Sequence, residues 1–524
     1  MTTGQPRDAR TEAVGASLST QVCVVGGGAA GIAATLRLAE RGLTVLLVEA
    51  GATEIEGATQ RLYAGRNIGL PYYDLLSCRL RYYGGTTNHW AGYCRANDPI
   101  DYEGRPELGV PAWPITAEDL APYVAEAAAT LGISESFFDP AAILTDRGAA
   151  PAGLLERRSS ALETKVFQLS RELRHARLFE PRMVASPRVE RVFNLNAVEL
   201  APSEDGRRIE RVLARTTTGK EVSIEAETFV LCCHAIENAR LLLVSRRADP
   251  RGIGNAHGHV GRHFMEHPHL FASRMIPSAA FPEIYDYDAM RRLRLNANLS
   301  LSAEAMRTHG VLNYYCRFNP VYARPGVAGA LGGLRAGFMR PFDPSLIDDM
   351  ARLMDDPAGA SNLIGAALRR RRPAPLWFDL EHRIEQAPNP DSRIVLREER
   401  DALGVPIADL DWRLNDLDVH TFAKGQEIVT RELAALGMGR FEIETIDRDL
   451  VGSRLLGHYH HIGTTRMSHD AADGVVDRDC RVHGLDNLYV GGSSVFTTSG
   501  YSGPTMMIIA MALRMADHVA ETAG

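Results

Sequence analysis

The chain has 524 residues, of which 45% are apolar and 23% are charged, and its formal net charge is -7. This composition is typical of a globular protein long enough for two or more domains, and it excludes a chain that is disordered throughout. The negative charge argues against a nucleic-acid partner and gives only a slight preference for neutral or cationic small molecules.

The N-terminal segment, residues 1–20, is polar and contains no apolar core of signal-peptide length. No apolar run in the chain reaches the roughly 18 to 20 residues that cross a bilayer. The seven cysteines are odd in number and scattered, which predicts buried thiols rather than a disulfide framework. We therefore expect a cytoplasmic protein without an integral membrane segment.

A glycine-rich turn near the N-terminus is the first motif with chemical content. It follows a β-branched run and opens an apolar helical pattern, after which a second strand pattern ends at an acidic residue. In chain order these are the strand 21–25, the glycines Gly26, Gly28 and Gly31, the helix 32–41, the strand 43–48 and Glu49. The spacing is that of a dinucleotide-binding unit, in which Gly28 lets the backbone approach a pyrophosphate and Gly31 permits close helix packing. Gly26 makes the tight turn, and Glu49 would accept hydrogen bonds from a ribose.

The same unit occurs in NAD-binding and FAD-binding proteins, so the glycines alone do not identify the dinucleotide. The sequence Glu49-Ala50-Gly51 after the second strand favours FAD. Ala30, inside the glycine turn, and Ala50 are expected at the same cofactor site.

A loop of small residues with a His-Trp pair follows, and small side chains let a backbone lie against a flat ring. The segment Gly84-Gly85-Thr86-Thr87-Asn88-His89-Trp90 resembles the flavin-contacting loop of the glucose-methanol-choline (GMC) oxidoreductases, in particular the branch that contains pyranose oxidase and fructose dehydrogenase. The resemblance implies FAD as the cofactor. It also implies the following flavin contacts: Gly85, Thr86, Asn88, His89, Trp90 and Ala91.

The resemblance leaves the attachment of the flavin open. His89 matches the histidine that carries a covalent bond to the flavin in pyranose oxidase, whereas relatives with the same His-Trp pair hold FAD non-covalently. A buried histidine packed on Trp90 is the alternative without a cofactor role. Ala91 stands where the family has a polar residue, which removes one hydroxyl group from the flavin's surroundings.

The middle of the chain combines family-like segments with departures. Residues 117–131 resemble the helical insert that follows the flavin loop in the family, and alternating apolar and polar residues over 192–230 predict an antiparallel meander. Residues 229–242 resemble the strand and helix that return under the FAD. They depart from the family at Cys232-Cys233-His234, where relatives have small residues. Because neighbouring strand residues point to opposite faces, we expect these three to fill the core rather than bind a metal.

Five histidines between residues 257 and 269 raise the same question of a metal site. They lack cysteines or carboxylates in helical register, so we expect a structural role and no metal. The histidines are His257, His259, His263, His267 and His269.

The predicted catalytic chemistry lies near the C-terminus. The segment 458–467 contains adjacent histidines, and neutral imidazole accepts a proton near neutral pH. In the His-x-x-Gly-Thr frame of this segment, the family's catalytic histidine matches His460, which leaves His461 as a neighbour. The later segment 474–495 resembles the strand that returns to the flavin, and it adds Gly492 and Ser493 to the expected cofactor contacts.

The last helix begins close to these residues. Proline suits the first turn of a helix, so Pro504 and Thr505 are expected to start a helix whose N-terminal dipole stabilises the reduced flavin by about 0.3 to 2 kcal/mol. Relatives have Asn or His as a second catalytic group where this chain has Gly503. The oxygen of Ser502 or Tyr501, His461, or a group of the substrate could replace it.

The sequence therefore predicts an α/β protein (α+β overall) with a Rossmann-like FAD-binding domain, 18–275 and 448–524, and a mostly antiparallel substrate domain, 276–447. The resemblance implies oxidation of an alcohol, such as a hydroxyl of a sugar, polyol, amino sugar or glycosylated metabolite, with His460 as base. A non-redox lyase of the hydroxynitrile-lyase kind, an aryl or aliphatic alcohol oxidase, and an FAD-stabilised binding protein are the alternatives. The electron acceptor, whether oxygen, a quinone or a redox protein, cannot be read from the residues.

Overall fold

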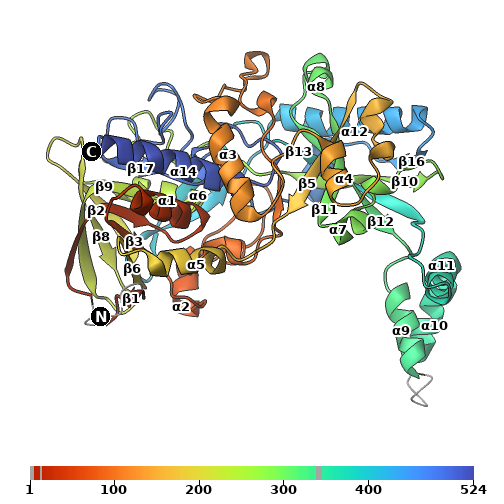
Figure 1. The fold of residues 1–524 in the computed structure, drawn as a ribbon, viewed down its shortest axis with the longest axis horizontal. Coiled ribbons are helices and arrows are strands. Elements are labelled where there is room, and N and C mark those ends of the chain that lie inside the picture. The colour runs from red at the N-terminus through yellow and green to blue at the C-terminus, as the bar shows by residue number, and fades with distance from the viewer. Residues whose placement is uncertain (1–4, 12–13, 338–344, 524) are drawn as a thin grey trace.

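The computed structural model describes residues 5–11, 14–337 and 345–523, and their elements form two large sheets at the two ends of the molecule (Figure 1). Among these residues, the first sheet has eight strands in the order β1-β6-β3-β2-β9-β8-β7, with β17 also paired to β9. Its strands are β1 (Arg7–Asp8), β2 (Ser17–Val25), β3 (Val45–Val48), β6 (Val189–Phe193), β7 (Asn196–Pro202), β8 (Ile209–Arg215), β9 (Glu221–Leu231) and β17 (Leu488–Val490).

The first sheet is parallel at its centre because β2, β3, β6, β9 and β17 are joined by crossovers, whereas β7, β8 and β9 form an antiparallel meander. Strand β3 and the last four residues of β2 are buried, and α1 (Ala29–Glu40) starts at the glycine turn between the two strands. Helix α14 (Thr505–Thr522) packs along α1. The predicted strand, glycine turn, helix and strand are confirmed within a few residues at each boundary.

The second sheet, as far as the structure describes it, has seven antiparallel strands in the order β16-β10-β13-β12-β11-β5-β4. They are β4 (Tyr93–Cys94), β5 (Leu162–Leu169), β10 (His269–Pro277), β11 (Leu295–Leu301), β12 (Tyr314–Val321), β13 (Trp377–Ile384) and β16 (Gly439–Ile443). Helix α12 (Asp416–Ala435) packs against β11, β12, β13 and β16. The combination of a Rossmann-like sheet and an antiparallel sheet confirms the predicted fold class.

The predicted domain boundaries stay a prediction. The antiparallel sheet takes β4 and β5 from the segment 18–275, and β10 starts before residue 276. Local patterns of apolar residues indicate that a strand is present, but they do not show which sheet it joins.

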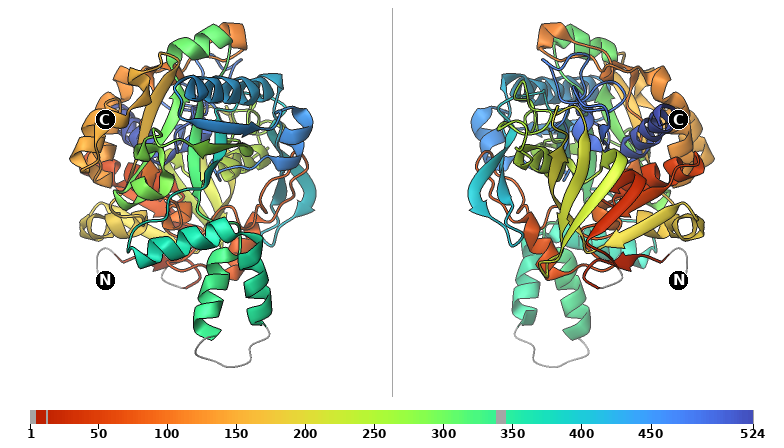
Figure 2. Two further views of the ribbon diagram at one scale, coloured as in Figure 1. Left: turned by 90° about the vertical axis from the view of Figure 1, so that its right-hand side faces the viewer. Right: turned by 90° about the vertical axis from the view of Figure 1, so that its left-hand side faces the viewer.

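The remaining elements connect and cover the two sheets (Figures 1 and 2). The helices are α2 (Gly57–Gln60), α3 (Ala117–Leu131), α4 (Pro140–Asp146), α5 (His175–Ala185), α6 (Ala235–Val244), α7 (Tyr287–Arg292), α8 (Ala303–His309), α9 (Val327–Gly337), α10 (Ser345–Asp355), α11 (Pro357–Leu368) and α13 (Arg448–Arg454). A separate hairpin consists of β14 (Arg393–Arg400) and β15 (Pro406–Asp411). Among the described residues, no helix combines the length and apolarity required to cross a bilayer.

Helices α9, α10 and α11 project from the end of the molecule that holds the second sheet (Figures 1 and 2). Ile347 and Met354 of α10 and Leu368 of α11 are 75%, 77% and 81% exposed. This apolar face of the projection is therefore not part of the protein core.

Candidate active site

A cavity of about 820 Å³ lies between the two sheets. Its walls come from the glycine turn before α1, the loop 77–93, the start of α14, the segment 458–461 and one face of the second sheet. Most predicted site residues line it: Gly26, Gly28, Ala30, Glu49, Ala50, Gly85, Thr86, His89, Trp90, Ala91, His460, His461, Gly492, Ser493, Gly503, Pro504 and Thr505. Segments that are far apart in sequence thus meet at one site, although the role of each residue stays a prediction.

Three predicted site residues do not line the cavity but lie directly behind it. The side-chain amide of Asn88 donates to the Tyr83 carbonyl oxygen at 2.8 Å, and the Ser502 hydroxyl donates to the Arg95 carbonyl oxygen at 2.7 Å. Gly31 lies under the glycine turn. These residues support the wall of the cavity.

The glycine turn has the shape that a dinucleotide requires. A Cβ at Gly26, whose φ is +103°, would lie 2.4 Å from the Cys232 carbonyl oxygen, and a Cβ at Gly31 would lie 1.8 Å from the Gly26 carbonyl oxygen. At Gly28 no atom lies within 4 Å of the Cβ position, so the backbone is open to the cavity there. Glu49 accepts hydrogen bonds from the backbone N–H of Gly27 and Gly51 at 2.7 and 2.8 Å. The residues present therefore fit the pyrophosphate and ribose of FAD at the N-terminus of α1.

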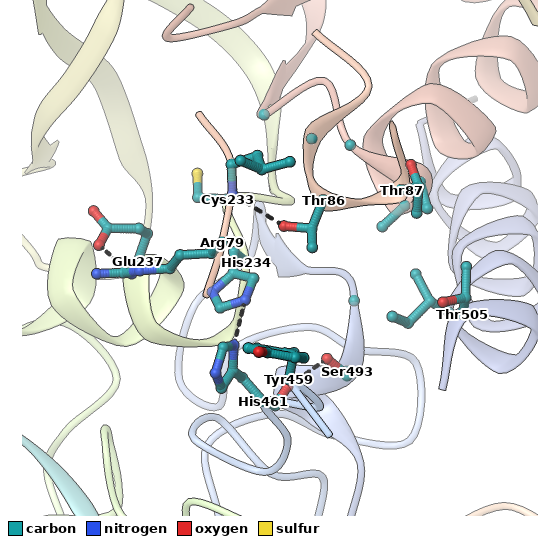
Figure 3. A pocket seen from close by; sticks show the side chains of 18 of the residues that line it. Arg79, Thr86, Thr87, Cys233, His234, Glu237, Tyr459, His461, Ser493 and Thr505 are labelled. Atoms are coloured by element: carbon teal, nitrogen blue, oxygen red, sulfur yellow. Dashed lines mark hydrogen bonds and ion pairs between the residues drawn. The ribbon is translucent and has the colours of Figure 1, made fainter. Parts of the chain in front are cut away.

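The loop before the flavin contacts is anchored by a buried ion-pair cluster that the sequence analysis missed (Figure 3). Arg79 is 1% exposed, and its Nη1 donates to Glu237 Oε1 at 2.7 Å. Burial alone would raise the pKa of Glu237, but the charges of Arg79, Arg240 and Arg81 lower it to about 2. The only signal in the sequence is the presence of charged residues within otherwise apolar segments.

His89 lies at the cavity, and its Nε2 is 3.0 Å from the Tyr82 hydroxyl oxygen. A covalent bond from this histidine to the flavin stays a prediction.

His460 is held by a second histidine that lies almost 200 residues earlier. His460 Nδ1 is 2.7 Å from His267 Nδ1, and His267 Nε2 is 3.0 Å from the Ser499 carbonyl oxygen. A carbonyl oxygen only accepts, so His267 Nε2 carries the proton and its Nδ1 accepts one from His460. Burial lowers the pKa of His267 to about 4, which keeps that ring neutral.

The consequence for His460 is a defined tautomer. Because its Nδ1 donates to His267, the neutral ring has no proton on Nε2, which keeps its lone pair. Burial, followed by the charges of His267 and Arg383, holds the pKa of His460 well below its usual value. His460 is therefore neutral near pH 7 and can accept a proton at Nε2.

Both ring nitrogens of His461, by contrast, are in hydrogen bonds. Its Nδ1 is 2.8 Å from His234 Nε2 (Figure 3). Its Nε2 is 2.9 Å from the Tyr72 hydroxyl oxygen. His234 Nδ1 accepts from the Ile236 N–H, so His234 Nε2 donates to His461, which in turn donates to Tyr72. The geometry therefore favours His460 over His461 as the base.

His234 also differs from its expected place in the core. It lines the cavity and has φ +85°, a backbone conformation that glycine adopts at no cost and that relatives with glycine would reach easily. Cys232 and Cys233 also line the cavity; Cys232 is buried, and the thiol of the partly buried Cys233 lies 3.3 Å from the Val25 carbonyl oxygen. The expectation that all three residues only fill the core is therefore wrong.

One buried carboxylate organises this histidine segment. Glu266 is 0% exposed, and it accepts the backbone N–H of His267, His458 and His460 at 2.6, 2.9 and 2.8 Å, in addition to the Tyr72 hydroxyl. Burial raises the pKa of Glu266 above its usual value, although these four donors oppose the shift. The four donors match the ionised form of the carboxylate, which only accepts hydrogen bonds. The three backbone donors among them fix the chain on both sides of Tyr459.

Gly503 leaves open the space in which relatives carry a polar side chain. A Cβ there would lie 3.3 Å from the Tyr93 carbonyl oxygen and 4.0 Å from His460 Cε1. The Ser502 hydroxyl donates to the Arg95 carbonyl oxygen, and the buried Tyr501 hydroxyl lies beside the Asp98 carboxylate and does not line the cavity. The structure therefore brings neither hydroxyl to the cavity as a second polar group.

Within the described residues, one trio of metal-ligand types is close enough to share an ion. Ligand atoms of His269, Glu381 and His458 all lie within 4.8 Å of one another. The carboxylate of Glu381 is already paired with Arg317 and Arg383, so two cations neutralise it. The predicted absence of a metal stays a prediction.

Several histidines are buried in the neutral form. Burial lowers the pKa of His175 to about 4, and neither of its ring nitrogens has a hydrogen-bond partner in the described part of the chain. Burial likewise lowers the pKa of His267 and His269 to about 4 and that of His234 and His382 to about 3.

These shifts predict acid destabilisation. Below about pH 6.5 the unfolded chain protonates histidines that stay neutral in the folded protein, so the free energy of unfolding falls between about pH 6.5 and 4, by at most about 1.4 kcal/mol per pH unit for each histidine. His175→Leu should reduce the loss of unfolding midpoint between about pH 7 and pH 5, whereas the exposed-site variant His257→Gln should not. A loss as large in His175→Leu as in the parent would contradict the prediction.

With this geometry in place, comparison with known proteins is informative. Residues 388–512 match the family described as GMC oxidoreductase, and residues 21–250 match the family described as FAD dependent oxidoreductase. The C-terminal match confirms the predicted resemblance to the GMC oxidoreductases. The prediction of FAD as cofactor is confirmed, and the protein is an enzyme of the oxidoreductase class.

Two curated relatives match this chain over nearly their full length. 2-Methyl-1,2-propanediol dehydrogenase from Mycolicibacterium austroafricanum is 24% identical, with 96% of this chain and 95% of that protein covered. 6'''-Hydroxyparomomycin C oxidase from Streptomyces lividus is 26% identical, with 95% and 91% covered. Both relatives are named for reactions of hydroxyl compounds.

Solved structures share the fold. Formate oxidase has a TM-score of 0.58 at 17% identity, with 97% of this chain and 99% of that chain covered. Pyridoxine 4-oxidase from Mesorbium loti has a TM-score of 0.55 at 18% identity, with 95% and 99% covered. These structures confirm the two-sheet architecture.

Proposed function

We propose that this GMC oxidoreductase oxidises an alcohol to a carbonyl compound and that His460 removes the hydroxyl proton. The observation that carries the proposal is the hydrogen bond between His460 Nδ1 and His267 Nδ1 at 2.7 Å, with His267 Nε2 committed to the Ser499 carbonyl oxygen. This arrangement leaves the lone pair on His460 Nε2 available. FAD bound in the cavity supplies the hydride acceptor.

The residues of the chain position the base, His460, and accept the proton of the substrate. Glu266 fixes the backbone at His460, and His267 orients its ring, so the base does not have to be arranged during the reaction. His460 Nε2 takes the proton of the bound hydroxyl as the carbinol carbon gives up its hydride. The N-terminus of α14, with Pro504 and Thr505 at the cavity, favours negative charge beside it.

The substrate class is a hydroxyl of a sugar, polyol, amino sugar or glycosylated metabolite. The names of the two curated relatives, a diol dehydrogenase and an oxidase of a hydroxyparomomycin, support a hydroxylated substrate. Oxygen, a quinone or a redox protein then takes the electrons, and the cytoplasmic location stays a prediction.

Anaerobic titration of the holoenzyme tests this function. Diols, sugars, amino sugars and aryl alcohols are added in turn, and at least one is expected to bleach the visible absorbance of the flavin with one carbonyl product per flavin reduced. A non-redox lyase would turn over its substrate without bleaching the flavin. Failure of every alcohol class to bleach the flavin would contradict the proposal.

A separate measurement tests the attachment of the flavin. Acid precipitation of the same sample shows whether the flavin stays on the protein through His89.

A further inference from the structure

One face of the antiparallel sheet forms the wall of the cavity opposite the glycine turn. Side chains alternate along a strand, so residues two apart share a face. The register places the following cavity-lining residues on the same face of four neighbouring strands: Phe167 of β5, Asn296 of β11, Tyr315 and Arg317 of β12, and Arg383 of β13. The wall that faces the substrate space therefore carries two guanidinium groups.

These two arginines share a single carboxylate. Arg383 Nε donates to Glu381 Oε1 at 2.6 Å, and Arg317 Nη2 pairs with Glu381 Oε2. Arg383 also donates to the Tyr315 hydroxyl oxygen at 2.9 Å. Two positive charges against one negative charge leave the cluster with a net charge of about +1, because arginine stays protonated in proteins.

Arg317 is the less satisfied of the two arginines. Its Nε is buried and has no hydrogen-bond partner among the residues that the structure describes, and its guanidinium carbon lies 4.5 Å from the centre of the Tyr287 ring. Burial and the charge of Arg383 lower the pKa of Arg317. A positive charge held out of water beside another cation is costly unless an anion joins it.

The cluster is close to the reacting end of the cavity. The charge of Arg383 contributes to the lowered pKa of both His458 and His460. A metal ion at His269, Glu381 and His458 is a poor explanation for the cluster, because the ion would add a third cation around Glu381. An anionic group is the ligand that the charges favour.

We propose that the substrate of this enzyme carries a carboxylate, which binds to Arg317 beside Tyr287 and Asn296 while the reacting hydroxyl lies at His460. The inference rests on the proposed alcohol oxidation and narrows its substrates to hydroxyl compounds that also carry a carboxylate, such as sugar acids and other hydroxy acids, in place of amino sugars. Arg317 lines the cavity with its side chain 20% exposed, its planar guanidinium matches the geometry of a carboxylate, and the Asn296 amide can donate to the same group. Cationic amino sugars are disfavoured, because the local charges at the cavity act on a ligand more strongly than the net charge of -7 spread over the chain.

A binding measurement tests the subsite without requiring turnover. Benzoate, benzamide and benzylammonium are titrated into the oxidised holoenzyme, and the change in flavin absorbance gives a dissociation constant for each. Benzoate is expected to bind at least about tenfold more tightly than benzamide, and benzylammonium more weakly than either. Equal binding of benzoate and benzamide, or no response to benzoate, would overturn the inference.

Matched variants test whether Arg317 causes the preference for benzoate. Arg317→Gln should lose the preference for benzoate by about tenfold, and Arg317→Lys, which keeps the charge without the planar fork, should retain part of it. Arg274→Gln is the control: Arg274 lies in the same sheet, pairs with Asp379 at 3.2 Å and lies 4.6 Å from the Trp377 ring, but it does not line the cavity. An unchanged benzoate preference in Arg317→Gln, with normal FAD content, would contradict the assignment.

Flavin reduction then separates this inference from the proposed function. Lactate, 1,2-propanediol and 1-amino-2-propanol present the same secondary hydroxyl with an anionic, neutral or cationic neighbour, and lactate should reduce the flavin fastest in the parent but not in Arg317→Gln. If none of a broad alcohol panel bleaches the flavin while benzoate still binds selectively, alcohol oxidation is wrong and the anion site stands. If neutral alcohols bleach the flavin as fast as hydroxy acids, alcohol oxidation stands and the carboxylate subsite is wrong.

Discussion

Replacement of His460 by asparagine is expected to slow anaerobic flavin reduction by about 10²- to 10⁴-fold while FAD stays bound. The asparagine amide can reproduce the hydrogen bond that His460 Nδ1 donates to His267 at 2.7 Å, so the loop keeps its support. It cannot reproduce the lone pair at Nε2. The remaining reaction must lose its hydroxyl proton to solvent hydroxide, so the residual rate should increase with pH.

The measurement is the rate of flavin bleaching after rapid anaerobic mixing with a substrate of the parent enzyme, at several pH values. His460→Ala is the companion variant, and it should lose at least as much activity because it also leaves His267 Nδ1 without a donor. The visible spectrum before mixing reports FAD content. Bleaching of His460→Asn at the parental rate would remove His460 from the role of base.

The local part of this site could be predicted from the sequence. The glycine turn, Glu49 and the start of α14 are defined by residues a few positions apart, and spacing of that kind is visible along the chain. The same holds for the helix over 117–131, whose ends coincide with those of α3. The frame around His460 was available only through resemblance to a family, because histidine spacing alone does not distinguish His460 from His461.

The supporting residues could not be predicted in this way. His267 and Glu266 contact His460 across more than 190 positions of sequence, and Tyr72 joins them from an earlier loop. Without the fold, His267 is one histidine among five in a short segment. Which of them reaches His460 depends on the path of the chain into β10, and residue spacing does not reveal that path.

The second sheet shows a different limit of prediction from the sequence. Alternation predicts that one face of β12 and β13 is directed inward, but not that this face meets the flavin-binding half of the chain. In the sequence, Arg317 and Arg383 are therefore indistinguishable from ordinary charged residues of amphipathic strands. The charge of the substrate space follows from their shared partner, Glu381, and becomes visible only when the register of the sheet is known.

The second large effect is expected for Glu266→Gln, which changes one carboxylate oxygen into an amide group. Each oxygen of Glu266 receives two donors: Oε1 accepts the His460 N–H and the Tyr72 hydroxyl, and Oε2 accepts the N–H groups of His267 and His458. An amide NH₂ cannot accept a hydrogen bond. In either orientation of the glutamine, the NH₂ group therefore faces two hydrogen-bond donors. The better orientation places the NH₂ at Oε1, where Tyr72 can rotate to accept but the His460 N–H loses its partner.

We therefore expect Glu266→Gln to lower the free energy of unfolding by about 1 to 3 kcal/mol and to reduce turnover, because the unsatisfied N–H belongs to the residue that carries the base. Thermal unfolding of the holoenzyme and anaerobic flavin reduction measure the two effects. Glu210→Gln, on the exposed side of β8, is the control for loss of one carboxylate charge and should change neither. Tyr72→Phe removes a single donor and leaves all three backbone partners of Glu266 in place, so its cost should be smaller. If Glu266→Gln unfolds at the parental temperature and reduces flavin at the parental rate, the carboxylate does not hold the histidine segment, and the orientation of His460 must come from His267 alone.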